Sequence, residues 1–310
     1  MQPELKAPII LFGNTRSGTT VVQNVMAAHP EVVGWYEPNA IWLYPDPRRL
    51  YDEFDERDAT ERVKRYIRKR FLAYQRRHGD RIVLEKSPQN ILRIPYVRAV
   101  FPEATFLYVV RHPLSFMSSV EHKWQRTVTG RGIVRRLKST PVSQLPYWLG
   151  RYLRQQFEKR VLKRKYLSIW GPKYRDIYKD LENHDLLTVI ARQWSECSRK
   201  AEQDLARFPD GEVLRLTYED FVTRPIEYSE QICEHCGLEM TDEIVQAANA
   251  SVKADRLDKW QRFDPQELAR ILPEIKDEML RHGYEIPGEI GDAVGKIRSA
   301  MTGPAARSVS

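Results

Sequence analysis

The chain has 310 residues, of which 42% are hydrophobic and 30% are charged, and its formal net charge is +8 at pH 7. This composition predicts a globular protein with one α/β domain or two small domains. It excludes a membrane span, because no run of eighteen apolar residues occurs. The charge is unevenly spread, since residues 123–175 hold fifteen Lys and Arg against a single acid, Glu158.

The first predicted unit is a strand, a tight loop and a helix over residues 8–24. An apolar run at 9–12 enters a loop of Gly, Thr and Ser, and the apolar residues that follow have helical spacing. Such a turn points several backbone N–H groups and the positive end of a helix dipole at one place. This arrangement suits a phosphate or a similar oxyanion.

The loop differs from the nucleotide P-loop in the place of its cation. Gly13 and Gly18 stand five apart as in that motif, but Thr19 occupies the place of the lysine and Arg16 lies inside the loop. A lysine in that place bridges the β and γ phosphates of a triphosphate, whereas an arginine within the loop can make a bidentate contact with a terminal oxyanion. We therefore expect phosphate binding without ordinary ATP or GTP hydrolysis. The alternative is a Gly/Ser turn in an unrelated α/β fold.

Residues 28–33 are predicted to lead into a second short strand, and residues 34–38 to form a loop that carries Glu37. From these residues alone, Glu37 is either a functional carboxylate or an exposed loop acid. Residues 47–78 are charged and have a helical period, which predicts a solvated helix without chemistry.

Two further strands are predicted to end at cations. The strand 81–84 leads to Lys86, and the nearly all-apolar strand 106–110 leads to Arg111. In a parallel sheet, ligands bind beyond the carboxyl ends of the strands. Together with Arg16, these residues predict an anionic ligand at that edge of the sheet.

The basic segment predicts an amphipathic helix over residues 147–170, because aliphatic and aromatic residues recur four apart with Lys and Arg between them. One interpretation is a covering helix whose cations are solvated. The others are an acidic acceptor, an anionic membrane surface in peripheral contact with residues 145–170, and nucleic acid. We expect no nucleic acid, because no readout module accompanies the charge.

The second half of the chain is predicted to hold four helices and one strand. The helices are 186–208, 226–236, 240–249 and 265–282, and the strand is 213–216. A polar, basic loop at 251–263 precedes the last helix, and the tail at 291–310 is expected to be mobile.

The three cysteines, Cys197, Cys233 and Cys236, are too few for a disulfide framework and fit a reducing compartment. Cys233 and Cys236 form a CxxC inside a helical pattern. Since no second Cys or His pair has metal spacing, packing is favoured over a zinc or redox role. The N-terminus lacks the basic and apolar regions of a signal peptide, so we expect a cytoplasmic protein, with the option of a peripheral membrane position.

Five short motifs follow one another along the chain. They are TRSGTT (15–20), AHPEV with a later Glu (28–37), EKSP (85–88), FPEATFLYVVRHPLSFMSS (101–119) and LTYEDFV (216–222). Together they resemble the sulfotransferases that use 3′-phosphoadenosine-5′-phosphosulfate (PAPS), and most closely the branch with tyrosylprotein and many bacterial carbohydrate sulfotransferases. The resemblance covers roughly residues 8–120 and 212–284.

The resemblance implies an α/β fold, with a parallel sheet and helices on both faces, in the manner of a P-loop NTPase-like three-layer sandwich. It further implies a single sulfotransferase domain over residues 1–290. The basic segment would be a helical insertion in this domain, at about 123–185.

Carried over by position, the resemblance implies a cofactor site and a catalytic pair. The 5′-phosphosulfate would be held by Arg16, Ser17, Gly18, Thr19 and Thr20, and the 3′-phosphate by Arg111 and Ser119, with Ser118 as the less favoured neighbour. Tyr218 and Lys259 would be further cofactor contacts. Ser251 is a weaker candidate, because the stretch that joins it to Lys259 is shorter than in the tyrosylprotein enzymes. Glu37 matches the family's catalytic carboxylate and Lys86 its catalytic lysine, which favours a functional Glu37 over an exposed loop acid.

The implied activity is transfer of the sulfuryl group of PAPS to an acceptor hydroxyl, with 3′-phosphoadenosine-5′-phosphate (PAP) as the product. Glu37 would accept the hydroxyl proton, while Arg16 and Lys86 would stabilise charge on the transferring group, as a metal does in kinases. We therefore expect no metal requirement. The charge of the basic segment favours a carbohydrate or glycolipid acceptor, in particular an anionic or lipid-linked glycan.

Two other functions compete with this interpretation. A P-loop kinase or NTPase would need a lysine after Gly18 and an acidic Mg²⁺ partner at a strand end, where this chain has Thr19, Lys86 and Arg111. A non-catalytic module would use the basic segment to bind membranes or polyanions.

Overall fold

The computed structural model describes residues 4–124, 170–251 and 263–286. In this part of the chain, a sheet of five parallel strands has the order β2-β3-β1-β4-β5. The strands are β1 (Ile9–Gly13), β2 (Val32–Tyr36), β3 (Ile82–Lys86), β4 (Thr105–Val110) and β5 (Val213–Thr217). This architecture confirms the predicted α/β fold with a parallel sheet.

Both faces of the sheet are buried, because its strands are apolar at nearly every position. In β1, Ile9 and Leu11 join one hydrophobic cluster, while Ile10 and Phe12 join the other. Each fully buried side chain of this size stabilises the fold by about 1.5–3 kcal/mol. The alternation therefore holds a helical layer on each face.

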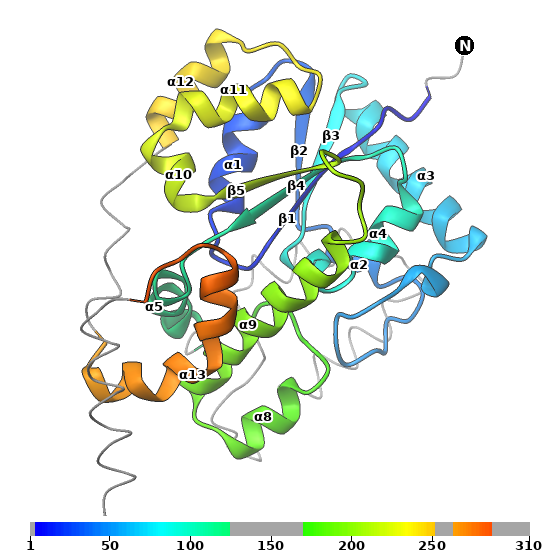
Figure 1. Cartoon of the computed structure of the whole chain (residues 1–310). Coiled ribbons are helices and arrows are strands. Elements are labelled where there is room, and N and C mark those ends of the chain that lie inside the picture. Colours follow the sequence, from blue (N-terminus) through cyan, green and yellow to red (C-terminus); the bar gives the residue numbers. More distant parts are fainter. Residues whose placement is uncertain (1–3, 125–169, 252–262, 287–310) are drawn as a thin grey trace, which may run out of the picture.

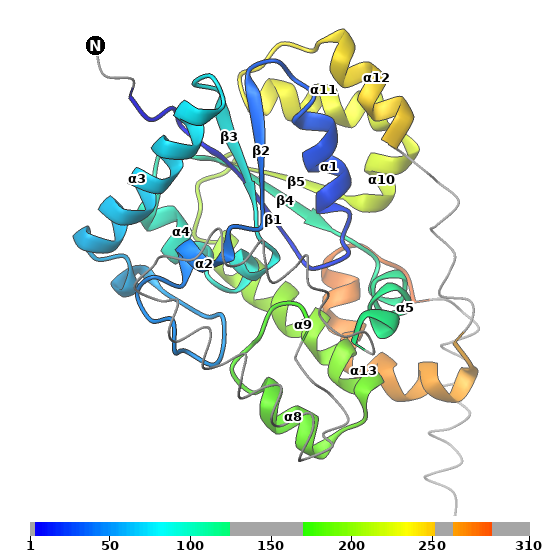
Figure 2. The same cartoon turned by 180° about the vertical axis from the view of Figure 1, so that it is seen from behind.

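The helices of the two layers come from different parts of the chain (Figures 1 and 2). One face is covered by α1 (Thr19–Met26), α10 (Tyr218–Thr223), α11 (Pro225–His235) and α12 (Asp242–Ser251). The other is covered by α3 (Glu61–Arg77), α4 (Ile94–Val100) and α9 (Leu186–Leu205). The three layers are those of the predicted sandwich.

The structure describes further helical segments besides those of the two layers. They are α2 (Asn39–Trp42), η1 (Glu56–Asp58), η2 (Pro88–Leu92), α5 (Pro113–Trp124), α8 (Ile177–Asn183) and α13 (Pro265–Arg281). Helix α13 begins at a capping box of Asp264 and Glu267 and packs against α9. Figure 1 shows α5 and α13 beyond the end of β4.

Two predicted boundaries were wrong. The helix predicted over 47–78 starts only at Glu61, because Asp52 makes tertiary hydrogen bonds instead. Its N–H donates to the Lys173 carbonyl at 2.7 Å, and its carboxylate accepts from the Lys173 N–H at 2.8 Å. The loop predicted over 34–38 starts only after Tyr36, because Gly34, Trp35 and Tyr36 pair with Leu84, Glu85 and Lys86 as part of β2.

The predicted basic helix at 147–170 lies almost wholly outside the described residues, but the two ends of the basic segment are placed. It leaves from the end of α5 and returns at Trp170, whose carbonyl accepts a hydrogen bond from Gln193 Nε2 at 2.9 Å. A Cβ added to Gly171 would lie 3.1 Å from Thr15 Oγ1. The returning chain therefore runs beside the loop after β1.

Cys233 is buried among apolar side chains, with its sulfur 4.0 Å from the sulfur of Met240. Burial raises the pKa of Cys233 to about 11 and that of Cys236 to about 12, so both are neutral thiols at pH 7. This environment fits the predicted packing role. Among the described residues, no helix is long and apolar enough to cross a bilayer.

Candidate functional site

The loop between β1 and α1 has two residues in the left-handed region, Arg16 with φ 65° and Gly18 with φ 83°. A Cβ at position 18 would lie 2.0 Å from the ring of Tyr218, so only glycine fits there. Gly18 caps α1 without a side-chain hydrogen bond, and the first turn of the helix has no acid. The orphan N–H groups and the dipole of α1 thus remain available for an anion.

Three distant segments of the chain meet at Arg16. The Arg111 Nη1 donates to the Arg16 carbonyl at 2.8 Å, and the Arg16 Nε donates to Ser119 Oγ at 2.8 Å. The guanidinium of Arg111 also lies 4.4 Å from the ring centroid of Tyr218. Four predicted cofactor residues are therefore in direct contact.

Lys86 connects the same loop to Glu37. Its ammonium donates to Thr20 Oγ1 at 3.2 Å and to Glu37 Oε1 at 3.0 Å, and it lies 3.9 Å from the ring centroid of Tyr36. The Lys86 side chain is 2% exposed, whereas that of Glu37 is 29% exposed. The cation is thus fixed inside the protein, while the carboxylate reaches the surface of the site.

The backbone of Glu37 is held in place by the neighbouring strand. Glu37 has φ 49°, a strained value for a residue with a Cβ, and its N–H donates to the Lys86 carbonyl at 2.9 Å. This bond continues the pairing of β2 and β3 by one residue. A carboxylate in this position can accept a proton, and the adjacent ammonium can stabilise negative charge.

The charges of this cluster fit an anion. Arg111 is 7% exposed, and burial lowers the pKa of its guanidinium, with Tyr218 and Glu219 acting in the opposite direction. Ser17 Oγ is buried without a hydrogen-bond partner among the described residues. A bound phosphate would offset the desolvation of the cation and give this hydroxyl an acceptor.

The comparison with known proteins identifies the family. A family model described as the sulfotransferase family matches residues 8–184 and 164–242, together more than half of the chain. The chain belongs to the sulfotransferase family. Membership confirms the resemblance seen in the motifs, and with it the enzyme class of a PAPS-dependent sulfotransferase.

Individual relatives of the sulfotransferase are distant. The nodulation protein NoeE of Sinorhizobium fredii (strain NBRC 101917 / NGR234) is 25% identical over 138 residues, which are 38% of this chain and 32% of NoeE. The match thus spans about a third of the length of that relative.

Among solved structures, the sulfotransferase domain from the curacin biosynthetic pathway is 14% identical with a TM-score of 0.57, over 92% of this chain and 100% of that one. The domain from the Synechococcus PCC 7002 olefin synthase is 14% identical with a TM-score of 0.55, over 93% and 99%. At these sequence identities, the structural similarity supports the fold alone.

Of the other predicted cofactor residues of the sulfotransferase, some lie at the loop after β1 and others do not. Ser17 and Thr19 are buried in the loop, and Ser118 is 5% exposed on α5 beside the residue that contacts Arg16. Ser251 is exposed at the end of α12, which packs against α1. Lys259 lies outside the described residues.

A second cluster, which sequence reasoning missed, lies next to Arg111. The Glu219 carboxylate accepts from the His112 N–H at 3.2 Å and from the Tyr284 hydroxyl at 3.0 Å, and the rings of His112 and Tyr284 are 5.0 Å apart. Glu219 belongs to the LTYEDFV motif, so that motif was the available signal. The cluster ties the segment after α13 to the strand end that carries Arg111.

His112 makes the stability of the sulfotransferase depend on pH. Burial lowers its pKa to about 4, helped by the charge of Arg111, from an unfolded value of 6.5. Between pH 4 and 6.5 the unfolded chain binds more protons, so this contribution is complete above pH 6.5 and is lost as the pH falls. Between pH 7 and pH 5, we expect the free energy of unfolding to fall by about 2 kcal/mol more in wild type than in His112→Phe.

The measurement is the free energy of unfolding in urea at pH 7 and pH 5 for both proteins. The paired comparison is needed because burial raises the pKa of Glu85 to about 7, which changes stability in the opposite direction over the same window. Parallel pH curves for wild type and His112→Phe would show that His112 does not titrate in this way.

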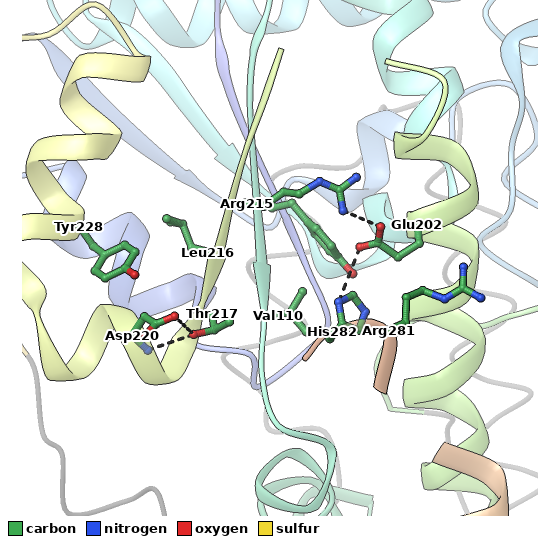
Figure 3. Close-up of a pocket in the computed structure, with 10 residues that line it drawn as sticks. Val110, Glu202, Arg215, Leu216, Thr217, Asp220, Tyr228, Arg281 and His282 are labelled. Atoms are coloured by element: carbon green, nitrogen blue, oxygen red, sulfur yellow. Dashed lines mark hydrogen bonds and ion pairs between the residues drawn. The ribbon is translucent and has the colours of Figure 1, made fainter. Parts of the chain in front are cut away.

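A pocket of about 260 Å³ lies beside β5, and its lining residues include neighbours in sequence of the predicted cofactor residues (Figure 3). Glu202 lies within it and pairs with Arg215 at 2.5 Å and with His282 at 3.7 Å. Val110 and Thr217, which line it, directly precede Arg111 and Tyr218. None of Arg16, Glu37, Lys86, Arg111 and Tyr218 lines this pocket.

Proposed function

We propose that this sulfotransferase binds PAPS in the loop after β1 and transfers the sulfuryl group to a hydroxyl activated by Glu37. Residues 16–20 would hold the 5′-phosphosulfate, and Arg111 with Ser119 the 3′-phosphate. Tyr218 would contact the cofactor beside Arg111, and Lys259 and Ser251 would be further contacts. The fit is supported by the buried guanidinium of Arg111 and the buried hydroxyl of Ser17.

The observation that carries the proposal is the convergence of three cations on one loop. Arg16 belongs to the loop, Arg111 donates to its backbone, and Lys86 donates to Thr20 at the start of α1. These residues come from the ends of the adjacent strands β3, β1 and β4. Their positive charges would all face one polyanion, which favours a nucleotide with two separate anionic groups.

PAPS supplies an activated sulfuryl group with a phosphate leaving group. In a loose, in-line displacement, the protein mostly positions the reacting groups and neutralises their negative charge, as in phosphoryl transfer. Glu37 would take the proton of the acceptor hydroxyl, and Lys86 and Arg16 would stabilise negative charge on the leaving and transferring oxygens. Because these cations already surround the site, the proposal includes no metal.

For the acceptor, we propose a carbohydrate or glycolipid hydroxyl, and in particular an anionic or lipid-linked glycan. The support is the charge of residues 123–175, whose two ends flank the candidate site. Cations close to the acceptor would raise the local concentration of an anionic substrate. Peripheral contact with a membrane through residues 145–170 belongs to the same proposal.

The test is an incubation of the full chain with radiolabelled PAPS and four acceptors: a neutral phenol, a neutral oligosaccharide, an acidic oligosaccharide and a glycolipid in vesicles. We expect label on the acidic oligosaccharide or the glycolipid. Release of inorganic sulfate gives a rate with water as the acceptor. Label on the phenol alone would contradict the acceptor, and absence of PAP binding by calorimetry would contradict the site.

A further inference from the structure

A network of hydrogen-bonded polar side chains, buried except for the partly buried Asn39, connects the end of β3 to α2 beside the larger hydrophobic cluster. Its members are Asn39, Trp42, Glu85, Asn90 and Arg93. Glu85, Asn90 and Arg93 are 0% exposed. Two of these three residues are ionisable, which makes their location expensive unless each is well hydrogen-bonded.

The contacts run from β3 to the start of α2. Glu85 accepts from Trp42 Nε1 at 3.2 Å and from Asn90 Nδ2 at 2.8 Å. Asn90 Oδ1 in turn accepts from Arg93 Nε at 2.8 Å, and Arg93 Nη2 donates to Asn39 Oδ1. Arg93 Nη1 is buried without a partner among the described residues. The two asparagines therefore orient the guanidinium.

The network is connected along the backbone to both members of the catalytic pair, Lys86 and Glu37. Glu85 precedes Lys86 in β3, and because successive strand residues point to opposite faces, it lies on the face opposite Lys86. Asn39 begins the four-residue helix α2, two residues after Glu37. The first residue of α2 is thus held by Arg93, and its last residue, Trp42, by Glu85.

Helix α2 is held by the burial of Ile41 and Trp42 in the larger hydrophobic cluster and, at its two ends, by this network. It is a single turn without a side-chain cap, and isolated turns of this length do not form in water. It follows Glu37, whose φ of 49° is strained and persists only if the surroundings enforce it. Whatever fixes α2 therefore also fixes the direction in which Glu37 leaves β2.

Stability alone does not explain the network. Apolar side chains of similar volume can replace buried ion pairs at no cost or with a gain, whereas a network of this kind can specify one geometry. We propose that Arg93 is a positioning residue, which acts through Asn39 to hold the Glu37 carboxylate against Lys86. The inference rests on the proposed role of Glu37 as the general base.

The test compares Asn39→Leu, which removes the acceptor for Arg93, with Asn39→Asp, which keeps an oxygen in its place. Turnover of saturating radiolabelled PAPS is measured with water and with the best acceptor of the panel, together with PAP affinity by calorimetry. We expect kcat to fall 10–100-fold in Asn39→Leu, because small displacements of reacting groups have effects of this size. PAP affinity should stay within twofold, and Asn39→Asp should restore kcat to within threefold of wild type.

A control variant separates positioning from a general loss of stability. Ile271 lies in α13 and is fully buried, so Ile271→Val should lower the stability of the fold without changing kcat more than twofold. A parallel fall of kcat and PAP affinity in Asn39→Leu would indicate a structural role and overturn the inference. So would a wild-type kcat, or an Asn39→Asp variant as slow as Asn39→Leu.

The same assay of Glu37→Gln separates this inference from the proposed function. If Glu37→Gln is inactive while Asn39→Leu is active, the positioning role alone is wrong. If Glu37→Gln turns over at the wild-type rate, the general-base assignment is wrong and the positioning role fails with it.

Discussion

A Glu37→Gln variant is expected to lose about three orders of magnitude in kcat while it still binds PAP within twofold of wild type. The amide keeps the size of the side chain and an oxygen for the Lys86 ammonium, which lies 3.0 Å from Glu37 Oε1. It cannot accept a proton, and a positioned general base contributes about 10²–10⁴-fold. The measurement is single-turnover transfer from labelled PAPS, with calorimetry for PAP.

The matched control is Glu31→Gln, an exposed acid in the turn before β2, which should transfer at the wild-type rate. A rate within threefold of wild type in Glu37→Gln would remove the carboxylate from the chemistry. A rate lost together with PAP affinity would instead point to damage to the loop, through the Lys86 bridge to Thr20.

An Arg111→Ala variant is expected to weaken PAP binding about 100-fold. Hydrogen bonds to charged groups contribute about 1.5–3 kcal/mol, and Arg111 is the buried cation assigned to the 3′-phosphate. Adenosine 5′-monophosphate lacks that phosphate, so its affinity should fall less than threefold. Calorimetry with both nucleotides gives the comparison.

The two nucleotides are needed because Arg111 also donates to the Arg16 carbonyl, so its loss can disturb the loop itself. Equal losses for PAP and for adenosine 5′-monophosphate would assign Arg111 to the loop and not to the phosphate. Arg98→Ala, which removes a surface pair with Glu212, serves as the control and should bind both nucleotides normally.

The sheet and the cluster of cations at its carboxyl edge could be predicted because their signals are local. A strand buried on both faces is a short apolar run, and the residue after it lies at the carboxyl edge of a parallel sheet. Lys86 and Arg111 were therefore found without any knowledge of their neighbours. The spacing of the motifs added Glu37, which the local pattern left undecided.

The supporting structure could not be predicted, because it depends on partners far away in the chain. Nothing near Asn39 in the sequence indicates its contact with Arg93, 54 residues later. Residues 47–60 have a helical period, but the hydrogen bonds of Asp52 to Lys173 fix them in another conformation. The left-handed backbone of Glu37 likewise results from tertiary contacts and not from its own preference.

The central position of β1 has a consequence for the order in which the protein is made. The loop with Arg16 leaves the ribosome 95 residues before Arg111. At 5–20 residues per second, this interval lasts roughly 5–20 s. During it, the first strand of the nascent chain lacks the β4 neighbour that completes its pairing. Nucleotide binding therefore cannot assist the earliest folding steps, and a chain released too soon would carry half of an anion site.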